Sequence, residues 1–407
     1  MFVWGALPGE RVMAKQTRRS REFDQAVTVE VLEASPDRVE PRCPHYGTCG
    51  GCSLQHLDGA KQIEVKQAAL LRQFSGAGVE PAAVLPPLVD AAWGYRRKGR
   101  LSVRRVEKKG KTLVGFRELD GRFVADLAEC HTVVPEVGMK LAALSELVDS
   151  LAARHAIPQI EFIAGDDAVA LVVRHMEPLE ESDRQALAAF GQAHSFVILL
   201  QPGGMDSVHP LWPAQAPALS FRMPEWNVEL GFQPLDFIQV NAGLNRKMIA
   251  LALGLLEAGS EHRVLDLFCG LGNFTLPLAR TAGAVVGVEG EPGLVARARD
   301  NATRNGITNA EFHAADLTRD QREAPWMAQG FDRLLLDPPR SGAIDVLQQL
   351  PLERFGRIVY VSCGPASLAR DAAYLVNERG WKLASAGVMD MFPHTAHVES
   401  IAMFEPG

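Results

Sequence analysis

The sequence predicts an α/β protein whose C-terminal part, residues 236–407, is a doubly wound sheet of parallel strands. Helix and strand patterns alternate there, and such alternation is typical of parallel strands joined by covering helices. Hairpin signals and one long amphipathic pattern indicate a smaller α+β unit upstream, in residues 93–235. Short stretches of alternating apolar and polar residues in residues 1–36 indicate further β-strands.

Size and charge limit the possible classes of protein. A chain of 407 residues with 47% hydrophobic content is long enough for two or three packed domains. A net charge of −7 excludes a protein that is basic all over, so any contact with nucleic acid must use a local patch. We find no run of 18 apolar residues and no secretory signal at the start. We therefore expect a cytoplasmic protein without a membrane span, and a monomer by default.

The N-terminal half contains fewer regular elements. We expect strands in MFVWG, LPGERVMAK and AVTVEVLE, and then a helix over 55–76. Its apolar stripe consists of Ile63, Val65, Ala68, Leu70, Leu71 and Phe74. Residues 81–87 are expected to be a linker. The central unit is predicted to contain a hairpin turning at Asp120-Gly121, a helix over 137–156, a hairpin turning near 165–167 and a loop over 202–217.

The C-terminal alternation allows each element to be placed. Helices are expected at 242–256, 274–281, 292–305, 343–350 and 366–379. Strands are expected at 263–268, 284–289, 310–314, 333–337, 357–362 and 381–391. The carboxyl ends of such strands meet at one edge, where α/β proteins bind their ligands.

The first of these strands leads into a turn that is typical of a cofactor site. In VLDLFCGLGNFTLPLA, Gly270 and Gly272 allow the backbone to approach a ligand closely. Thr275 stands where a dinucleotide fingerprint needs its third glycine. Glu289 ends the next strand, where an acid can bind ribose hydroxyls, and Asp316 follows the third strand. This order fits S-adenosylmethionine better than NAD; a purely structural turn is the alternative.

A thiol and an acid follow later strands. Cys363 follows an apolar strand, Glu399 lies in HTAHVES, and the rigid DPPR loop (337–340) carries Asp337. A thiol with a nearby acid is equipped for covalent attack on an electron-poor ring, such as uracil, and then proton removal. The alternatives are a buried core cysteine and a surface carboxylate. We expect Cys269 to be a packing residue and assign no catalytic role to His394 or His397.

Four cysteines form a second group. Cys43, Cys49 and Cys52 lie in CPHYGTCGGC, and Cys130 follows in LAECHTVVP. Four thiolates complete a tetrahedral zinc site or an iron–sulfur cluster. We favour a structural [4Fe–4S] cluster over zinc or free thiols. His45 and His56 are not expected to be ligands.

One basic stretch stands out in an acidic protein. Residues 95–111, YRRKGRLSVRRVEKKGK, carry nine cations and one acid, Glu107. The stretch is a candidate for binding phosphates, and a solvated strand face is the alternative. Trp93 and Tyr95 beside it are suited either to stack on a base or to pack in the core.

Taken together, these motifs resemble those of the bacterial RNA uracil-5-methyltransferases, and most of all the members that act on 23S rRNA and carry an iron–sulfur cluster. The matching segments are CPHYGTCGGC with Cys130, FIQVNAGLNRKM, LDLFCGLGNFTLPLA, DPPRSG, VSCGP and HVES. The resemblance implies that Cys363 is the nucleophile, that Glu399 is the base, and that the four cysteines hold a [4Fe–4S] cluster. It implies an S-adenosylmethionine site lined by Gln239, Phe268, Asn273, Glu289, Asp316 and Asp337. The implied substrate is a uridine of 23S rRNA; the alternative is a sister enzyme acting on a different rRNA or tRNA uridine.

The resemblance also implies a division into domains. Residues 1–36 resemble only the later part of a TRAM domain, a small RNA-binding β-barrel. We expect either that the start codon has been assigned too far downstream or that the first part of this domain has been lost. Residues 37–54 and 87–235 are expected to form a central α+β domain with the iron–sulfur loop. Residues 55–86 and 236–407 are expected to form a Rossmann-like methyltransferase domain.

Overall fold

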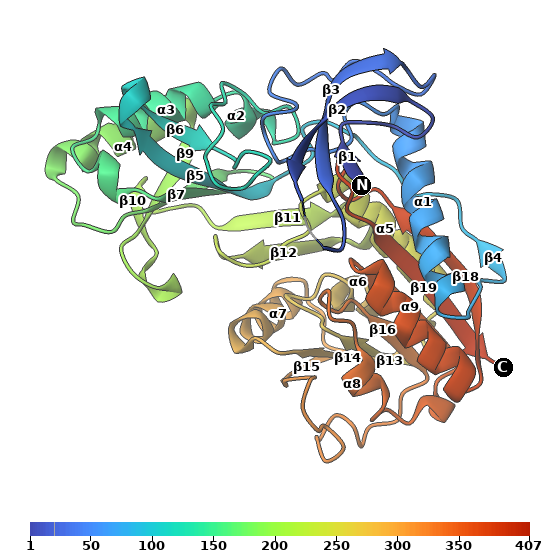
Figure 1. Cartoon of the computed structure of the whole chain (residues 1–407). Helices are drawn as coiled ribbons and strands as arrows, with labels where there is room; N and C mark the ends of the chain where they lie inside the picture. The colour runs from blue at the N-terminus through green and yellow to red at the C-terminus, as the bar shows by residue number, and fades with distance from the viewer. Residues whose placement is uncertain (20) are drawn as a thin grey trace.

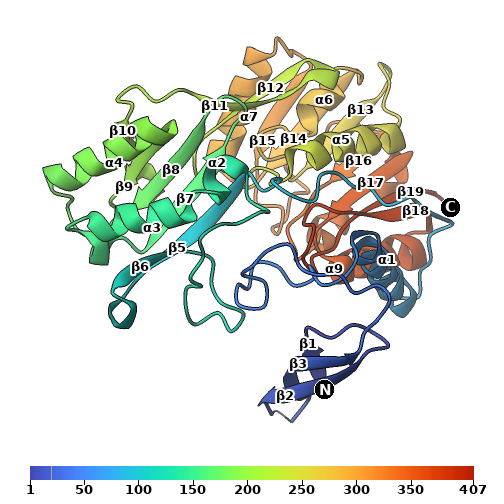
Figure 2. The same ribbon diagram turned by 90° about the horizontal axis from the view of Figure 1, so that it is seen from above.

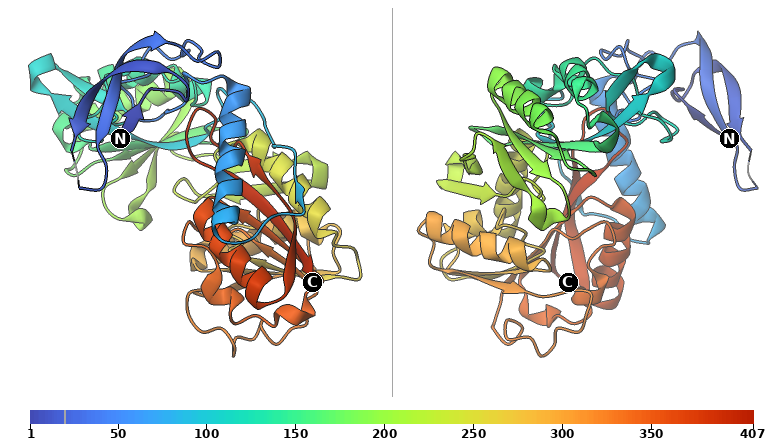
Figure 3. Two further views of the ribbon diagram at one scale, coloured as in Figure 1. Left: turned by 45° about the vertical axis from the view of Figure 1, so that its right-hand side comes forward. Right: turned by 90° about the vertical axis from the view of Figure 1, so that its left-hand side faces the viewer.

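The computed structural model describes residues 1–19 and 21–407. Their strands form sheets of three, six, two and eight strands. The three-stranded sheet at the N-terminus stands apart from the rest of the molecule (Figures 2 and 3), whereas the other sheets and their helices pack against one another (Figure 1). Nowhere in these residues is a helix both long enough and apolar enough to cross a lipid bilayer.

The N-terminal sheet confirms the three expected strands. It has the order β1-β3-β2, with bounds β1 Phe2–Trp4, β2 Arg11–Arg18 and β3 Gln25–Glu33. β1 and β3 run parallel, and β2 and β3 run antiparallel. Most side chains of β2 are exposed, so this sheet contributes little core of its own.

Helix α1 (Gly59–Gly76) is shorter than predicted, because Asp58 caps its first turn by accepting a hydrogen bond from the backbone N–H of Ala60. Its buried face includes Ile63, Leu70 and Phe74, as expected, but the prediction for Val65 is wrong, since this side chain is 46% exposed. Two polar residues, Gln62 and Lys66, are buried instead. α1 packs on α9 (Pro365–Ala373) and β18 (Trp381–Met389) of the C-terminal part.

The central unit is built on a six-stranded sheet of order β10-β9-β8-β7-β5-β6. Its strands are β5 Lys98–Val106, β6 Lys111–Gly115, β7 Gln159–Ala164, β8 Val169–Arg174, β9 Phe196–Gln201 and β10 His209–Trp212. Its helices are α2 Pro135–Gly138, α3 Leu141–Ser150 and α4 Glu181–His194, and α3 and α4 cover the sheet (Figure 2).

Two predictions for this unit need correction, and two of its elements were not predicted. The helix predicted over 137–156 is divided, because residues 139 and 140 leave the helical path between α2 and α3. The predicted loop over 202–217 contains β10, which pairs antiparallel with β9. α4 and β9 were not predicted, although the hairpin of β7 and β8 turns at residues 165–168 as expected.

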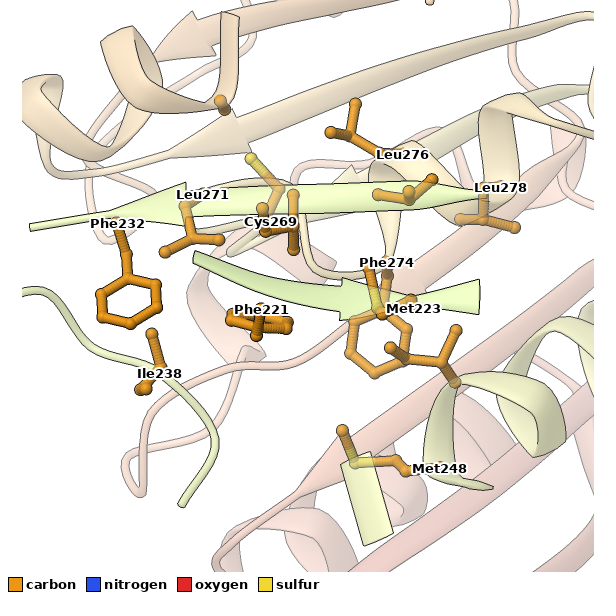
Figure 4. Close-up of a cluster of buried hydrophobic side chains, with 14 of the residues drawn as sticks. Phe221, Met223, Phe232, Ile238, Met248, Cys269, Leu271, Phe274, Leu276 and Leu278 are labelled. Atoms are coloured by element: carbon orange, nitrogen blue, oxygen red, sulfur yellow. The ribbon is translucent and has the colours of Figure 1, made fainter. Parts of the chain in front are cut away.

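A two-stranded hairpin joins the central unit to the C-terminal part. Strands β11 (Leu219–Met223) and β12 (Val228–Phe232) pair antiparallel. Phe221, Met223 and Phe232 point into a cluster that also contains Cys269, Leu271, Phe274 and Met248 (Figure 4). The prediction that Cys269 is a packing residue is confirmed, because its side chain is buried in this cluster.

The C-terminal part is an eight-stranded sheet of order β15-β14-β13-β16-β17-β19-β18-β4. Its remaining strands are β4 Ala83–Val84, β13 Arg263–Leu267, β14 Ala284–Glu289, β15 Ala310–Ala314, β16 Arg333–Leu336, β17 Arg357–Ser362 and β19 Glu399–Pro406. The helices here are α5 Ala242–Leu256, α6 Thr275–Ala279, α7 Pro292–Arg304 and α8 Ile344–Leu347; a π-helical turn, Tyr374–Glu378, follows α9.

Hydrophobic residues cover both faces of this sheet. Val264 and Leu335 belong to a cluster with α5, α6 and α7, whereas their neighbours Leu265 and Leu334 belong to a cluster with α1, α8 and α9. Successive strand residues point to opposite faces, so the two clusters are the two layers of a doubly wound fold.

The prediction of a wholly parallel sheet is wrong at one edge. β13 to β17 are parallel, but β19 lies between β17 and β18 and is antiparallel to both. The predicted linker over 81–87 contains β4, which extends the sheet beyond β18.

Candidate active site

The order of these strands brings Cys363 and Glu399 together. The ladder of β17 and β19 pairs Val361 with Ile401 and Ser362 with Ser400. Cys363 is the next residue after β17, and Glu399 is the first residue of β19. The charge of Glu399 raises the pKa of the Cys363 thiol, so the thiol and the carboxyl group lie near each other.

Asp337 joins this pair from the adjacent strand. It directly follows β16, and its backbone N–H donates to the carbonyl of Leu267 over 3.3 Å. The charges of Glu399 and Asp337 both act on Cys363, and that of Asp337 acts on Glu399. The structure therefore gathers the predicted nucleophile, the predicted base and Asp337 at the carboxyl edge of the sheet.

Burial makes the charged forms of these three groups unfavourable. Burial, and then the charges of Glu399 and Asp337, raise the pKa of the Cys363 thiol. Burial and the charge of Asp337 raise the pKa of Glu399 to about 8, and burial raises that of Asp337 to about 7. Arg340 opposes the shifts at Cys363 and Glu399 because its cation favours their anions. Because the pKa values of Glu399 and Asp337 are about 8 and about 7, these two carboxyl groups can exchange protons near neutral pH.

The predicted cofactor turn follows β13. Phe268, Gly270 and Gly272 have positive φ angles of 64°, 56° and 96°. This backbone turns the N–H of Gly270 toward Glu289, whose Oε2 accepts it over 3.0 Å. Glu289 is thus held beside the turn, as predicted for an acid that binds a ribose.

A buried aspartate lies beneath this turn. The side chain of Asp266 is fully buried; its Oδ2 accepts a hydrogen bond of 2.5 Å from Thr275 Oγ1, and its Oδ1 has no partner among the described residues. Burial raises its pKa to about 8. Such an orphaned oxygen beside a sharply turned backbone fits a site for a polar cofactor. Asp266 is the last residue but one of β13, directly before the turn.

The other predicted cofactor residues have partners of their own. Asn273 exchanges two amide hydrogen bonds of 2.9 Å with Asn245. Gln239 is half-buried, and its carbonyl accepts a hydrogen bond from Arg97. Asp316 is exposed; it accepts from the hydroxyl of Thr318 and forms an ion pair with Arg319. The contacts of Asp316 are therefore within its own loop.

The four predicted metal ligands line a common cavity. Cys43, Cys49, Cys52 and Cys130 surround a space of about 250 Å³. Burial raises the pKa of Cys49 to about 11 and that of Cys52 to about 12. Within residues 1–19 and 21–407, no three His, Cys, Asp or Glu side chains meet the geometry for holding a metal ion. The structure thus gathers the four cysteines around one cavity, and the metal group that they were predicted to hold stays a prediction.

The cysteine loop contacts the loop that precedes Glu399. The backbone N–H groups of Ser53 and Leu54 both donate to the carbonyl of His394 over 2.9 Å. The N–H of Ala396 in turn donates to Ser53 Oγ over 3.0 Å. His397, in the same loop, lines the cysteine cavity and accepts a hydrogen bond of 2.9 Å from Arg340.

Helix α1 holds the same loop from its other side. Lys66 is 2% exposed, and its Nζ contacts Asp390 over 2.6 Å and donates to the carbonyl of Phe392 over 3.0 Å. Gln62 accepts from the N–H of His394. The burial of Gln62 and Lys66 was not predicted from the sequence. Both continue, at a spacing of four residues, the row of Leu70 and Phe74 on the buried face of α1.

The basic stretch is largely paired with acids. Glu161 pairs with Lys98 and Arg100, and Asp126 pairs with Lys109 and Lys111. Arg105 pairs with Asp149, and Arg97 is buried. This arrangement favours the solvated strand face over a continuous phosphate-binding patch. Tyr95 is buried too, and its hydroxyl donates to the carbonyl of Pro393.

Comparison with known proteins gives three matches of interest. Residues 227–405 match the family described as tRNA (Uracil-5-)-methyltransferase. Proteins from Xanthomonas campestris pv. campestris (strain 8004) and Stenotrophomonas maltophilia (strain K279a) are each 69% identical over 405 residues, covering 99% of this chain and 91% of their own. Both are named 23S rRNA (uracil(1939)-C(5))-methyltransferase RlmD.

A solved structure is similar over the whole fold. The crystal structure of Pyrococcus abyssi tRNA (uracil-54, C5)-methyltransferase in complex with S-adenosyl-L-homocysteine has a TM-score of 0.75 and 23% sequence identity. The match covers 99% of this chain and 95% of the other. At this identity the likeness concerns the fold.

Proposed function

Because the chain belongs to the RNA uracil-5-methyltransferase family, we propose that it transfers a methyl group from S-adenosylmethionine to carbon 5 of a uridine in 23S rRNA. The observation that carries the proposal is that Cys363, directly after β17, and Glu399, at the start of the paired strand β19, lie close enough for their charges to interact. The names of the relatives that are 69% identical support 23S rRNA as the substrate.

Cys363 is the nucleophile in this proposal. Carbon 5 of uracil is a poor nucleophile until a thiolate adds to carbon 6 and forms a sulfur–carbon bond, which leaves an enolate. Carbon 5 would then attack the methyl group of S-adenosylmethionine, whose methyl–sulfur bond breaks as the new carbon–carbon bond forms, so that S-adenosylhomocysteine would leave. Glu399 removes the hydrogen from carbon 5, the double bond re-forms, and the thiolate of Cys363 leaves carbon 6.

The raised pKa values suit these roles. A carboxyl group with a pKa of about 8 exists in both forms near neutral pH, so Glu399 can accept a proton and release it again. Arg340 contributes by favouring the thiolate of Cys363 and the carboxylate of Glu399. Asp337 lies between the nucleophile and the cofactor turn, where its carboxyl group can orient the uracil edge or the cofactor.

The cofactor is proposed to bind along the turn after β13. Glu289 would accept hydrogen bonds from the ribose hydroxyls, and Phe268 and Asn273 would line the turn. Gln239 and Asp337 would close the site from the neighbouring segments. For Asp316 to contribute, its carboxylate must exchange the contact with Thr318 for the ligand.

The cysteine cavity is proposed to hold a [4Fe–4S] cluster bound by Cys43, Cys49, Cys52 and Cys130. A single zinc ion needs four sulfur atoms at about 2.3 Å, whereas a cluster spreads its ligands over a wider cavity. Visible absorbance and iron content of anaerobically purified protein test this assignment, with Cys130→Ser as the variant and Cys269→Ser as the matched control. A colourless protein that contains zinc would refute it.

The catalytic proposal is tested by tritium release from 5-tritiated uridine in 23S rRNA and tRNA transcripts, with S-adenosylmethionine present. We expect release from 23S rRNA alone with the wild type and none with Cys363→Ala. Release from tRNA alone would keep the chemistry and overturn the substrate. Wild-type release with Cys363→Ala as active as wild type would overturn the assignment of the nucleophile.

A further inference from the structure

The DPPRSG loop, residues 337–342, carries Asp337 and Arg340 and lies between β16 and α8. It is in contact with the segment that carries Cys363. Gly364 directly follows Cys363, and a side-chain carbon added to it would come within 3.1 Å of the carbonyl oxygen of Arg340. The position of this loop therefore determines how close the cation of Arg340 lies to the thiol.

The far end of the loop is held by a buried carboxylate that the mechanism above does not use. Asp371 belongs to α9, and its side chain has no exposed surface. Its Oδ2 accepts the backbone N–H of Ala343, the first residue after the loop, over 2.7 Å. The same oxygen accepts the hydroxyl of Tyr360 over 2.7 Å. Tyr360 lies on β17, three residues before Cys363, so one oxygen joins the loop to the strand of the thiol.

Arg370 holds the loop through a second set of contacts. Its Nε donates to Asp371 Oδ1 over 2.8 Å, and its Nη2 donates to the carbonyl of Ser341 over 2.8 Å. Gly342 packs directly on the carboxylate, because a side-chain carbon there would come within 2.6 Å of Asp371 Oδ2. Its φ angle of 85° also favours glycine. Both oxygens of Asp371 are thus engaged as acceptors, and each of them fixes the loop.

Stability alone does not explain a charged group at this position. Asp371 lies on the buried face of α9, together with Leu368 and Ala372. Replacing a buried ion pair by apolar residues is often neutral or stabilising. An apolar side chain could not accept the N–H of Ala343, and it could not orient Arg370. What the carboxylate adds is therefore the position of the loop.

We propose that Asp371 is a positioning residue for the reaction, which holds the DPPRSG loop so that the cation of Arg340 stays beside Cys363. The inference rests on the proposed function, because it takes Cys363 to be the nucleophile. If the loop is released, Arg340 moves away and the thiolate is less favoured, so the pKa of Cys363 rises. Loss of a carboxylate by itself would lower the pKa of a nearby thiol. The direction of the change therefore separates positioning from a direct effect of charge.

The test follows alkylation of Cys363 by iodoacetamide against pH, with the modified peptide identified by mass spectrometry. It needs no RNA, and the thiol is partly exposed. In Asp371→Asn the amide offers one acceptor where two oxygens accept now. We expect the rate profile to move to higher pH, with alkylation about threefold slower at pH 7. Asp345→Asn, at an exposed acid of α8, is the matched control and should react like wild type.

A double variant tests whether Asp371 acts through Arg340. Arg340→Gln alone should slow alkylation at pH 7 about tenfold, and Asp371→Asn added to it should slow it no further. Tyr360→Phe keeps the size of the side chain and removes the hydroxyl that orients Asp371. It should slow alkylation about twofold, and it decides the question if Asp371→Asn does not fold.

Alkylation at the wild-type rate or faster in the folded variants would overturn the proposal. So would a double variant in which the two effects multiply. In tritium release, Asp371→Asn should lower kcat about threefold with KM for RNA unchanged. If wild type releases no tritium from any RNA, the proposed function fails, and alkylation still decides whether Asp371 holds Arg340 at Cys363.

Discussion

At the scale of single residues, the candidate site is a set of groups whose charges depend on one another. Cys363 directly follows β17, Glu399 begins the neighbouring strand β19, and Asp337 follows a third strand, β16. Arg340 is the cation that favours the anionic forms of both Cys363 and Glu399. Small changes of charge at this site should therefore change the pH at which the protein is active.

Replacing the proposed base should stop the reaction after covalent attack. In Glu399→Gln the thiolate can still add to carbon 6, but the hydrogen on carbon 5 cannot be removed, so the thiol cannot leave. We expect methylated RNA bound covalently to the protein, seen as a slow band on a denaturing gel, and at least about 100-fold less free product. The double variant Glu399→Gln with Cys363→Ala should lose the band. Normal turnover by Glu399→Gln would exclude it as the base.

Arg340→Gln should shift the pH dependence of activity upward. The cation lowers the pKa of Cys363 and of Glu399, so its removal raises both, and the active anions form only at higher pH. The rising limb of kcat/KM against pH should move to higher pH, with about tenfold lower activity at pH 7 and recovery in alkali. Arg340→Lys keeps the charge and serves as the control. A lower activity without a shift of the rising limb of kcat/KM against pH would mean that Arg340 does not act on the reaction through its charge.

At the scale of elements, α1 determines the position of the loop that leads to Glu399. The helix belongs to the N-terminal half of the chain, yet Lys66 and Gln62 contact residues 390–394 of the C-terminal part. The cysteine loop holds His394 and Ala396 from another side. The proposed base is thus held by two segments more than 300 residues away in the sequence.

Lys66→Met should destabilise the protein strongly. Its ion pair with Asp390 is buried, and loss of one partner leaves the other charge uncompensated, which costs about 3–5 kcal/mol in the free energy of unfolding. Urea denaturation measures the loss, and kcat should fall because the loop loses an anchor. Lys66→Met with Asp390→Leu should recover much of the stability. Lys61→Met, at an exposed pair with Glu64, is the control and should leave the free energy of unfolding unchanged.

At the scale of the whole molecule, the central unit and the C-terminal part share one hydrophobic cluster. Residues of β8 and β9, such as Val172 and Leu199, belong to the same cluster as Val264 of β13, joined through the hairpin of β11 and β12 (Figure 4). If one of two segments that share a core unfolds alone, apolar surface of the other is exposed to water, and this exposure costs free energy. The two units should therefore open together.

Hydrogen exchange of the folded protein tests this expectation. The backbone amides of Leu171 in β8 and Leu265 in β13 should exchange with the same free energy of opening, because their strands also carry Val172 and Val264, which belong to the common core. Amides of the N-terminal sheet, such as that of Val27, are the comparison and should exchange faster, since that sheet is largely exposed. A clearly lower free energy at Leu171 than at Leu265 would show that the central unit opens by itself.

The sequence by itself determined the elements whose patterns are local. The bounds of β14, β15, β17 and α5 were predicted to the residue, because short runs of mainly apolar residues, or a helical pattern after a capping residue, are visible within a short window. The glycines of the cofactor turn and the spacing of the cysteines were informative for the same reason, since short loops need particular residues.

Only the tertiary structure decided how distant segments meet. The antiparallel insertion of β19, the addition of β4 to the sheet and the burial of Lys66 all depend on partners far along the chain. Apart from Glu107, which pairs with Arg105, the acids that pair with the basic stretch lie 15 to 63 positions from their cations, so its charge could not be judged from its composition. Hydrogen bonds and ion pairs between distant segments leave no periodic pattern, because their geometry exists only after the chain has folded.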